Sequence, residues 1–412
     1  MIRAALTGLM LLCAAASHAA ETKGKSMSYA EARDFLSRHT RVVELCDASG
    51  ARVAVCPAWQ GRVMTSTCGG AQGPSFGFIN SPYIEAGKVD KHFNNYGAEE
   101  RMWLSPEGGP FSLWFKPGVP QALADWYTPL GLNETPWQLA GEPTATACRM
   151  GVRTTVPNAS GTQFDLEIGR EVRLLPADEL TSLFGPAAAA IAQPGVQRVG
   201  YETINRVTNR GPAMTKEKGM VSIWILGMMN SAPRTVILVP YRQGDEASLG
   251  PAVKSDYFGP VPPERLKVLP GLILFRADGN YRAKIGVSQR RVKNVLGSID
   301  FAANMLTLVQ FTMPDDPAQA IYLNNQWGGQ DEPYRGDVAN SYNDGPLAPG
   351  KPGLGPFYEI ESLSPARALA TGETLVHHHR TVHIQADRRV LADLAAKILG
   401  ADLDRVEAEM GK

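Results

Sequence analysis

The chain has 412 residues, and its 41 Lys and Arg balance its 41 Asp and Glu, so the formal net charge is zero. A neutral balance gives no general attraction to nucleic acid or to anionic membranes, and we expect no nucleic-acid partner. The 41 Gly and 30 Pro are spread along the chain, which is typical of a strand-rich fold with many turns.

The first 19 residues have the pattern of a secretory signal peptide. Arg3 supplies the positive charge, residues 4–16 are apolar, and residues 17–19 (Ser-His-Ala) form a small-x-small cleavage site. We expect a mature chain that starts near Ala20 and is periplasmic or secreted. No later stretch reaches the apolar length that spans a bilayer, so we expect no membrane span.

Four cysteines follow the expected cleavage site: Cys46, Cys56, Cys68 and Cys148. An oxidising compartment permits two disulfides, whose three possible connectivities the sequence leaves open. Their spacing is not that of a zinc site. We expect disulfides that pin the N-terminal strands.

The N-terminal segments predict one helix and a small antiparallel meander. Ser28–Arg38 combines a Ser N-cap with apolar residues at helical spacing. Val42–Leu45 and Arg52–Val55 flank a turn and form a hairpin, and Gly61–Ser66 is a third short strand.

Further along, segments of strand length and composition dominate the chain. They are Thr162–Ile168, Arg170–Leu174, Val199–Thr208, Met220–Leu226, Thr235–Pro240, Leu272–Ala277, Tyr281–Val287, Met305–Thr312 and Leu375–Gln385. Leu180–Ile191 is expected to be helical, and a helix at about 388–410 closes the chain. With few helices between the strands, we expect one all-β sandwich domain over residues 20–412.

A long polar segment interrupts this pattern at Ile321–Pro365. Its loop, Trp327–Asn343, mixes aromatic rings with amides and carboxylates, and it leads to a strand at Phe357–Glu361. Long loops of this kind are usually functional or disordered. A sugar offers an apolar ring face and a rim of hydroxyls to such a set, although a loop that only solvates the surface is the alternative.

Two glutamates on the Phe357–Glu361 strand are candidates for acid–base chemistry. The alternation of a strand places Glu359 and Glu361 on one face. Two carboxylates this close cannot both ionise cheaply, which prepares one of them as a general acid or base. The alternative is an exposed acidic face on an edge strand.

The last strand carries four histidines, of which His377, His379 and His383 share a face. A His-x-His pair on a strand can chelate a transition metal, but no further ligand lies nearby in the sequence. We therefore expect no metal and no other cofactor, and histidines that form hydrogen bonds or contact sugar. A metal held by these three residues is the minor alternative.

A second dense block runs from His92 to Phe115 and includes Glu99, Glu100 and Arg101. Adjacent glutamates point to opposite faces of an extended chain, so we expect only one of the two to share a pocket with the neighbours of Arg101. Surface ion pairing is the alternative interpretation.

Several of these blocks together resemble a family of secreted bacterial proteins of unknown function within the galactose-mutarotase-like, or aldose-1-epimerase-like, superfamily. The resemblance rests on GRVMTST (61–67), YGAEERMWLSPEGGPFSLWF (96–115), GSID (297–300), EPYRGDVANSYNDGP (332–346), GPFYEIESLSPA (355–366) and HHHRTVH (377–383). It implies a large β-sandwich of mutarotase type with a pocket on its concave face.

The resemblance also implies site residues. Arg101 before Gly109-Pro-Phe111 is similar to the sugar-binding Arg of mutarotases, and Glu359 is similar to their catalytic Glu. With Glu359 we group Glu361, His377 and His379 as catalytic candidates. The expected substrate-binding residues are Arg101, Glu100, His92, Trp103, Trp327, Tyr334, Asp337 and Asn340.

One departure concerns the acid. Mutarotases carry a catalytic His in a His-x-x-Phe segment, and the matching stretch here, Met220–Met229, has none. His92, His377, His379 or Tyr334 could take its place. We expect an exported protein that acts on or binds a sugar or oligosaccharide, with acid–base chemistry near the anomeric carbon. A non-catalytic glycan-binding module and a structural envelope protein are the alternatives.

Overall fold

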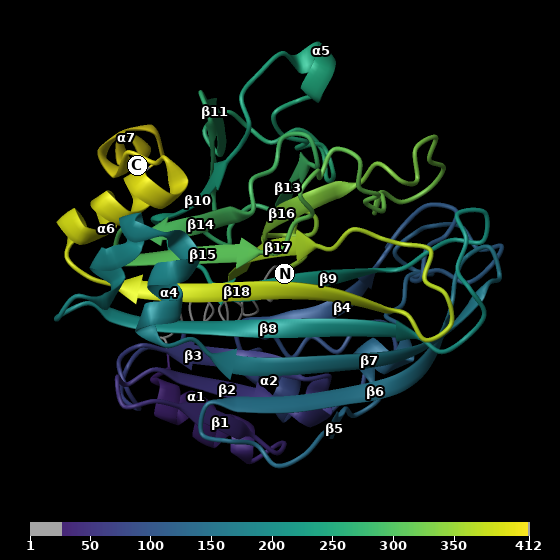
Figure 1. The fold of residues 1–412 in the computed structure, drawn as a ribbon, viewed down its shortest axis with the longest axis horizontal. Coiled ribbons are helices and arrows are strands. Elements are labelled where there is room, and N and C mark those ends of the chain that lie inside the picture. Colours follow the sequence, from purple (N-terminus) through teal and green to yellow (C-terminus); the bar gives the residue numbers. More distant parts are fainter. Residues whose placement is uncertain (1–26, 411–412) are drawn as a thin grey trace, which may run out of the picture.

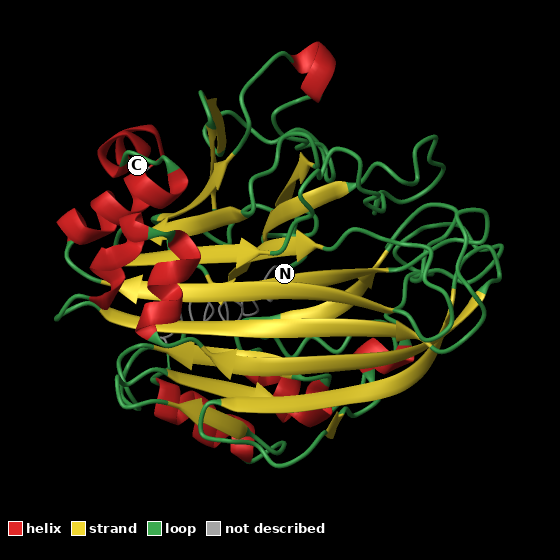
Figure 2. Cartoon of the chain, viewed as in Figure 1, coloured by secondary structure: helices red, strands yellow, loops and turns green. Residues whose placement is uncertain are grey.

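The computed structural model describes residues 27–410 and consists mainly of antiparallel strands in three sheets (Figures 1 and 2). The expected signal peptide at residues 1–19 lies outside the described residues. Over residues 27–410, no helix is long and apolar enough to cross a membrane.

The N-terminal segments fold as the sequence predicts. Helix α1 (Tyr29–Ser37) begins with a capping box, in which Ser28 accepts from the Glu31 N–H and Glu31 accepts from the Ser28 N–H. It packs on a three-stranded sheet of β1 (Val43–Cys46), β2 (Arg52–Cys56) and β3 (Arg62–Thr67).

Ser28→Ala is expected to lower the free energy of unfolding by about 1 kcal/mol, because the cap loses the side-chain acceptor for the Glu31 N–H. Chemical denaturation of the wild type and the variant measures this change. An unchanged stability would contradict the structural role of the cap.

The largest sheet has ten strands, all paired antiparallel, in the order β11-β12-β10-β14-β15-β18-β8-β7-β6-β5. Its long strands run across the front of Figure 1. Their bounds are β5 (Gln138–Leu139), β6 (Ala147–Pro157), β7 (Gln163–Leu174), β8 (Gln197–Asn209), β10 (Thr235–Pro240), β11 (Leu266–Leu269), β12 (Leu272–Arg276), β14 (Val295–Asp300), β15 (Met305–Phe311) and β18 (Thr374–Gln385).

A five-stranded antiparallel sheet packs against the ten-stranded one. Its order is β13-β16-β17-β9-β4, with β4 (Arg101–Ser105), β9 (Ser222–Asn230), β13 (Ala283–Ser288), β16 (Asp337–Asn343) and β17 (Phe357–Leu363). Side chains from alternate β17 positions bridge the two sheets. Tyr358 bonds Ser298 of β14 at 2.8 Å, and Ser362 bonds both His377 and His379 of β18 at 2.8 Å.

Helices cover one end of the large sheet, where α4 (Ala177–Phe184), α6 (Arg388–Leu394) and α7 (Leu403–Met410) lie together in Figure 1. Their apolar residues share a core with β10, β12, β14, β15 and β18. The other helical segments are α2 (Ser81–Glu85), α3 (Leu130–Asn133), α5 (Glu246–Leu249), the 3₁₀ turns η1 (Pro57–Trp59) and η2 (Pro186–Ala192), and the π-turn η3 (Ala395–Leu399).

Several expected elements differ in the structure. The strands expected at Thr162–Ile168 and Arg170–Leu174 are the single strand β7, and the helix expected at Leu180–Ile191 is divided between α4 and the 3₁₀ segment η2. Asp337–Asn343, expected within a loop, is the fully buried strand β16 between β13 and β17, because tertiary pairing outweighs its polar composition. The closing helix expected at 388–410 is broken, because Gly400 adopts the left-handed conformation (φ 65°) that ends a helix.

The expected disulfides are wrong, since all four cysteines are free thiols. Cys46 pairs with Arg52, four residues before Cys56 on the same strand. At the rise of a strand, the Cα atoms of Cys46 and Cys56 are roughly 13 Å apart, which no disulfide spans. Cys68 instead donates its thiol to Gln385 at 3.3 Å, and Cys148 is buried in β6.

Candidate functional site

The strand register of the five-stranded sheet builds one row of side chains across it. Arg101 of β4 lies opposite Leu226, which lies opposite Glu361, then Asn340, then Gly286 of β13. Directly paired residues point to the same face of a sheet. Because Tyr358 and Ser362 point toward the ten-stranded sheet, this row lies on the opposite face, and we call it the site row.

A buried ion pair closes one end of the site row. Arg101 Nη2 donates to Glu359 Oε1 at 2.9 Å, and their side chains are only 4% and 7% exposed. The guanidinium also lies 4.4 Å from the ring centroid of Trp103. Burial raises the pKa of the Glu359 carboxyl and the charge of nearby Glu361 adds to this, while Arg101 opposes both.

Glu361 is anchored at the centre of the site row. Its Oε2 accepts from Lys284 Nζ at 3.0 Å, from Trp224 Nε1 at 2.9 Å and from Asn340 Nδ2 at 3.2 Å. Burial lowers the pKa of Lys284, but the charges of Glu361, Glu107 and Glu359 outweigh it, so the ammonium stays protonated. Neither Lys284 nor Trp224 was among the expected site residues.

The other end of the site row is a niche lined with oxygen atoms. A Cβ at Gly286 would lie 2.5 Å from Asp337 Oδ2 and 2.8 Å from both Asn340 Oδ1 and the Tyr257 hydroxyl. Tyr257 donates to Asp337, and Lys254 Nζ lies 3.3 Å from the other Asp337 oxygen. Only glycine leaves this space open, so the three oxygens converge on it.

Five buried polar atoms of the site row and of neighbouring Trp103 have neither a hydrogen-bond partner nor an ion-pair partner among the described residues. Three are donors and two are acceptors: Arg101 Nε, Arg101 Nη1, Trp103 Nε1, Asn340 Oδ1 and Glu361 Oε1. Buried polar groups in proteins are normally paired. A polyhydroxyl ligand, each of whose groups both donates and accepts, matches such a mixed set.

The two long motifs of the sequence meet beside the site row. Asn325 Oδ1 accepts from the Ser105 hydroxyl and from the Glu107 N–H, both at 2.7 Å. Trp327 then packs edge-to-face on Phe115, with ring centroids 5.1 Å apart. The segment after Ile321 and the block ending at Phe115 therefore form one rim.

The expected convergence of the histidines with Arg101 and Glu359 is wrong. His377 and His379 bond Ser362, which alternates with Glu361 along β17 and so points to the opposite face. Their strand, β18, belongs to the other sheet. The two histidines are therefore separated from the site row by the backbone of the five-stranded sheet.

Both Glu99 and Glu100 also lie between the sheets, contrary to expectation. Glu99 bonds His383 Nε2 at 3.0 Å, and Glu100 bonds Arg170 at 2.7 Å and lies 3.8 Å from His379 Nε2. The alternation rule fails here because this segment makes isolated bridges, and Ala98 has a φ of 132°. Glu100 is thus part of a buried polar cluster and not of the site row.

The remaining expected residues divide between the two regions. Trp103, Asp337 and Asn340 line the site row, and Trp327 lies at its rim. His92 bonds the backbone carbonyl of Trp126, behind that rim. Tyr334 donates to the Lys216 carbonyl and stacks on Phe111, with ring centroids 5.9 Å apart. Neither partner belongs to the site row.

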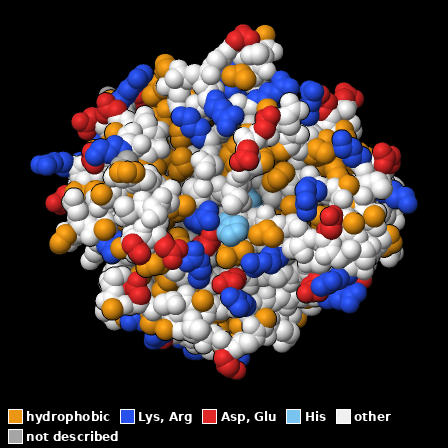
Figure 3. Space-filling view, in the orientation of Figure 1, with side chains coloured by type: hydrophobic (Ala, Val, Ile, Leu, Met, Phe, Trp, Pro, Cys, Tyr) orange, Lys and Arg blue, Asp and Glu red, His pale blue; other side chains and the backbone are white. Residues whose placement is uncertain are grey.

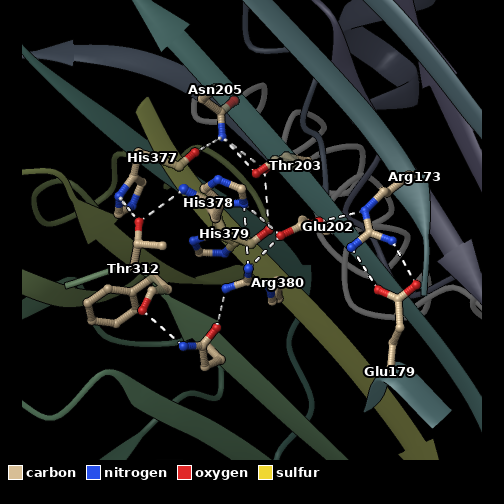
Figure 4. Close-up of polar contacts among 12 residues, drawn as sticks. Arg173, Glu179, Glu202, Thr203, Asn205, Thr312, His377, His378, His379 and Arg380 are labelled. Carbon is tan, nitrogen blue, oxygen red and sulfur yellow. Dashed lines mark hydrogen bonds and ion pairs between the residues drawn. The ribbon is translucent and has the colours of Figure 1, made fainter. Parts of the chain in front are cut away.

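A further polar network occupies the outer face of the ten-stranded sheet (Figure 4). Glu202 accepts from Arg173 at 2.6 Å, from Arg380 at 2.6 Å and from His378 at 2.8 Å. Burial raises the pKa of Glu202, but the bond from His378 and the two arginine charges outweigh it and lower the pKa to about 2. Figure 3 shows that charges of both signs are interspersed over this face, as in an ion-pair network.

Within residues 27–410, no group of three or more His, Cys, Asp or Glu side chains has the geometry to hold a metal ion. The nitrogens of the three aligned histidines instead face Ser362, Thr307, Thr312 and Glu99. Two shallow surface hollows, of about 510 and 370 Å³, lie elsewhere, around Gly195–Gln197.

The buried histidines predict a pH dependence of stability. Burial lowers the pKa of His377 to about 3 and that of His379 well below its usual value. Below about pH 6.5 these histidines bind protons in the unfolded chain but not in the folded chain. The folded protein therefore becomes less stable as the pH is lowered. Burial raises the pKa of Glu100 to about 7, and this carboxyl acts in the opposite direction.

His377→Asn is therefore expected to flatten the acid side of the stability curve. Relative to pH 7, the wild type should lose about 2 kcal/mol more than the variant at pH 5. Urea denaturation at the two pH values measures the difference. Equal losses would show that His377 is not held neutral in the folded protein.

The two large antiparallel sheets form the all-β sandwich that the sequence predicts. The chain belongs to the family of unknown function DUF6786, whose profile matches residues 27–410. No curated protein sequence matches it.

Solved structures with a similar fold include a candidate aldose 1-epimerase of Escherichia coli K12, at 11% identity and a TM-score of 0.48 over 84% of this chain and 99% of that one. The Slr1438 protein of Synechocystis sp. PCC 6803 shares 12% identity, with a TM-score of 0.46 over 84% and 96%. A galactose mutarotase related enzyme of Lactobacillus acidophilus shares 8%, with a TM-score of 0.45 over 84% and 99%. At this distance the likeness concerns the fold and not the reaction.

Proposed function

We propose that this protein binds a sugar along the site row and performs acid–base chemistry at its anomeric carbon. The observation that carries the proposal is the set of five unpartnered donors and acceptors beside aromatic rings and carboxylates. The aromatic rings of Trp103 and Trp224 match the apolar face of a sugar ring. We also propose export, on the basis of residues 1–19.

In this proposal Glu359 is the base. Burial keeps the pKa of its carboxyl raised, which favours proton transfer at neutral pH. Arg101 fixes the orientation of the carboxylate through the 2.9 Å bond and keeps two further N–H groups for substrate oxygens. Glu361 and Asn340 each offer one acceptor to sugar hydroxyls, so the ring is oriented from both ends.

A non-catalytic glycan-binding module is the second candidate. It is favoured by the direct pairing of Glu359 with Arg101, because a salt bridge is also a way to hold a binding guanidinium in place. The two candidates differ in turnover and not in binding.

Trp103→Phe tests the binding common to both. The variant keeps an aromatic ring but loses the indole N–H together with the five-membered ring that carries it. We expect affinity for the best ligand of a sugar panel to fall about tenfold, the cost of one hydrogen bond. Trp59→Phe, in the N-terminal cluster, is the matched control. Titration calorimetry that finds equal affinities in all three proteins would overturn the site assignment.

A further inference from the structure

We propose that Glu107 is the group that protonates the ring oxygen of the bound sugar, opposite the base Glu359. This inference rests on the proposed function and supplies its acid. Glu107 lies two residues after the end of β4, the strand that carries Arg101 and Trp103, and was not among the expected catalytic residues.

The backbone of Glu107 is held on both sides. Its N–H donates to Asn325 Oδ1 at 2.7 Å, and its carbonyl accepts from the Ser112 hydroxyl. Asn325 is itself fixed by the Ser105 hydroxyl at 2.7 Å. The side chain therefore starts from a defined point at the rim, which an acid needs in order to reach one substrate atom.

The carboxyl of Glu107 lies among indole donors and beside the site row. Trp126 Nε1 donates to its Oε1 at 3.0 Å, and the Trp327 indole also donates to the carboxyl. Burial raises the pKa of the carboxyl to about 7, although the residue as a whole is half-buried. Glu361 adds to this, while Lys284 and the two indoles oppose it. A carboxyl in this state exchanges a proton readily near neutral pH.

Other groups near the site row are poorly suited to donate this proton. His377 and His379 face the other sheet, and the Tyr257 hydroxyl already donates to Asp337. Lys284 carries protons but has a raised pKa, which makes it a weak acid. Glu107 combines a transferable proton with a position at the rim.

The step balances without any other reactant. Glu359 takes the proton of the anomeric hydroxyl, Glu107 gives its proton to the ring oxygen, the bond between C1 and that oxygen breaks, and a carbonyl forms at C1. Closure on the opposite face of the carbonyl reverses both proton transfers and inverts C1. The substrate class is therefore a sugar with a free hemiacetal, not a glycoside.

Glu107→Gln tests this assignment, because the amide oxygen still accepts from the indoles but holds no transferable proton. We expect anomer exchange, measured by NMR exchange spectroscopy, to fall about 100-fold or more while sugar affinity is retained. Glu332→Gln is the matched control, since the Glu332 side chain is exposed and forms a surface ion pair with Arg335.

The pH profile separates an acid from a structural residue. Trp126→Phe removes a donor that lowers the pKa of Glu107, so the alkaline limb of the exchange rate should move to higher pH. Wild-type exchange in Glu107→Gln, or an unmoved limb in Trp126→Phe, would overturn the inference. If the wild-type protein binds a sugar but does not catalyse anomer exchange, the inference is also overturned, and the glycan-binding module becomes the favoured function. If no sugar binds the wild type, the proposed function itself fails.

Discussion

Arg170→Met is expected to lower the free energy of unfolding by about 3–5 kcal/mol, because it removes the cation that pairs with a buried carboxylate. Arg170 Nη2 lies 2.7 Å from Glu100 Oε1, and both side chains are fully buried between the sheets. Arg170 also donates to Asn205 at 2.8 Å, so the variant leaves a second buried acceptor with one donor fewer.

The loss in Arg170→Met should grow with pH. Burial already raises the pKa of Glu100 to about 7, and removing Arg170 raises it further. At pH 6 the carboxyl can hold a proton, whereas at pH 8 the folded protein must either bury a bare charge or take up a proton from an alkaline solution. Urea denaturation at both values measures this.

Arg149→Met is the matched control for Arg170→Met. Arg149 also lies on the ten-stranded sheet and pairs with a glutamate, Glu171, at 2.9 Å, but its side chain is 68% exposed. We expect no measurable loss of stability in the control. Equal effects of the two substitutions would contradict the burial of the Glu100 cluster.

Glu359→Gln is expected to lower the rate of anomer exchange about 100- to 10,000-fold, because the amide cannot take the proton of the anomeric hydroxyl. Sugar binding should survive, since the amide oxygen can still accept from Arg101 Nη2. Exchange spectroscopy for the rate and calorimetry for the affinity separate the two effects.

The control for Glu359→Gln is Glu167→Gln, because the exposed Glu167 side chain of β7 forms a surface ion pair with Arg210. Exchange in this variant should equal that of the wild type. Unaltered exchange in Glu359→Gln would remove Glu359 from the reaction and favour the binding module.

Much of the sandwich could be predicted from the sequence. Segments such as Thr235–Pro240 and Met305–Phe311 are rich in β-branched and apolar residues, and the structure places strands there. The N-cap predicted at Ser28 also marks a helix start that the structure confirms. These are local signals, which a single sequence carries well.

The polar strand β16 was the main failure of local reasoning. Its residues Asp337, Asn340 and Asn343 favour turns, and only pairing with β13 and β17 makes them a strand. Strand register joins residues far apart in the chain, and no spacing within one segment reveals it.

The site could be predicted only in part for the same reason. Arg101 and Glu359 carried motif signals and lie together, 2.9 Å apart. Lys284 and Gly286 carry no motif and enter through the register of β13 with β16. The histidines were misplaced because alternation says which residues share a face but not which sheet that face meets.

The most direct test of the account is whether a sugar reaches the site row. Protein with ¹⁵N-labelled tryptophan has seven indole signals, and Trp103→Phe and Trp59→Phe assign two of them. On titration with a panel of reducing sugars, we predict that the Trp103 indole N–H shifts saturably, because it is a buried donor without a partner, while that of Trp59 does not move. A panel in which no sugar shifts the Trp103 signal, or shifts it only in proportion to concentration, would contradict the account.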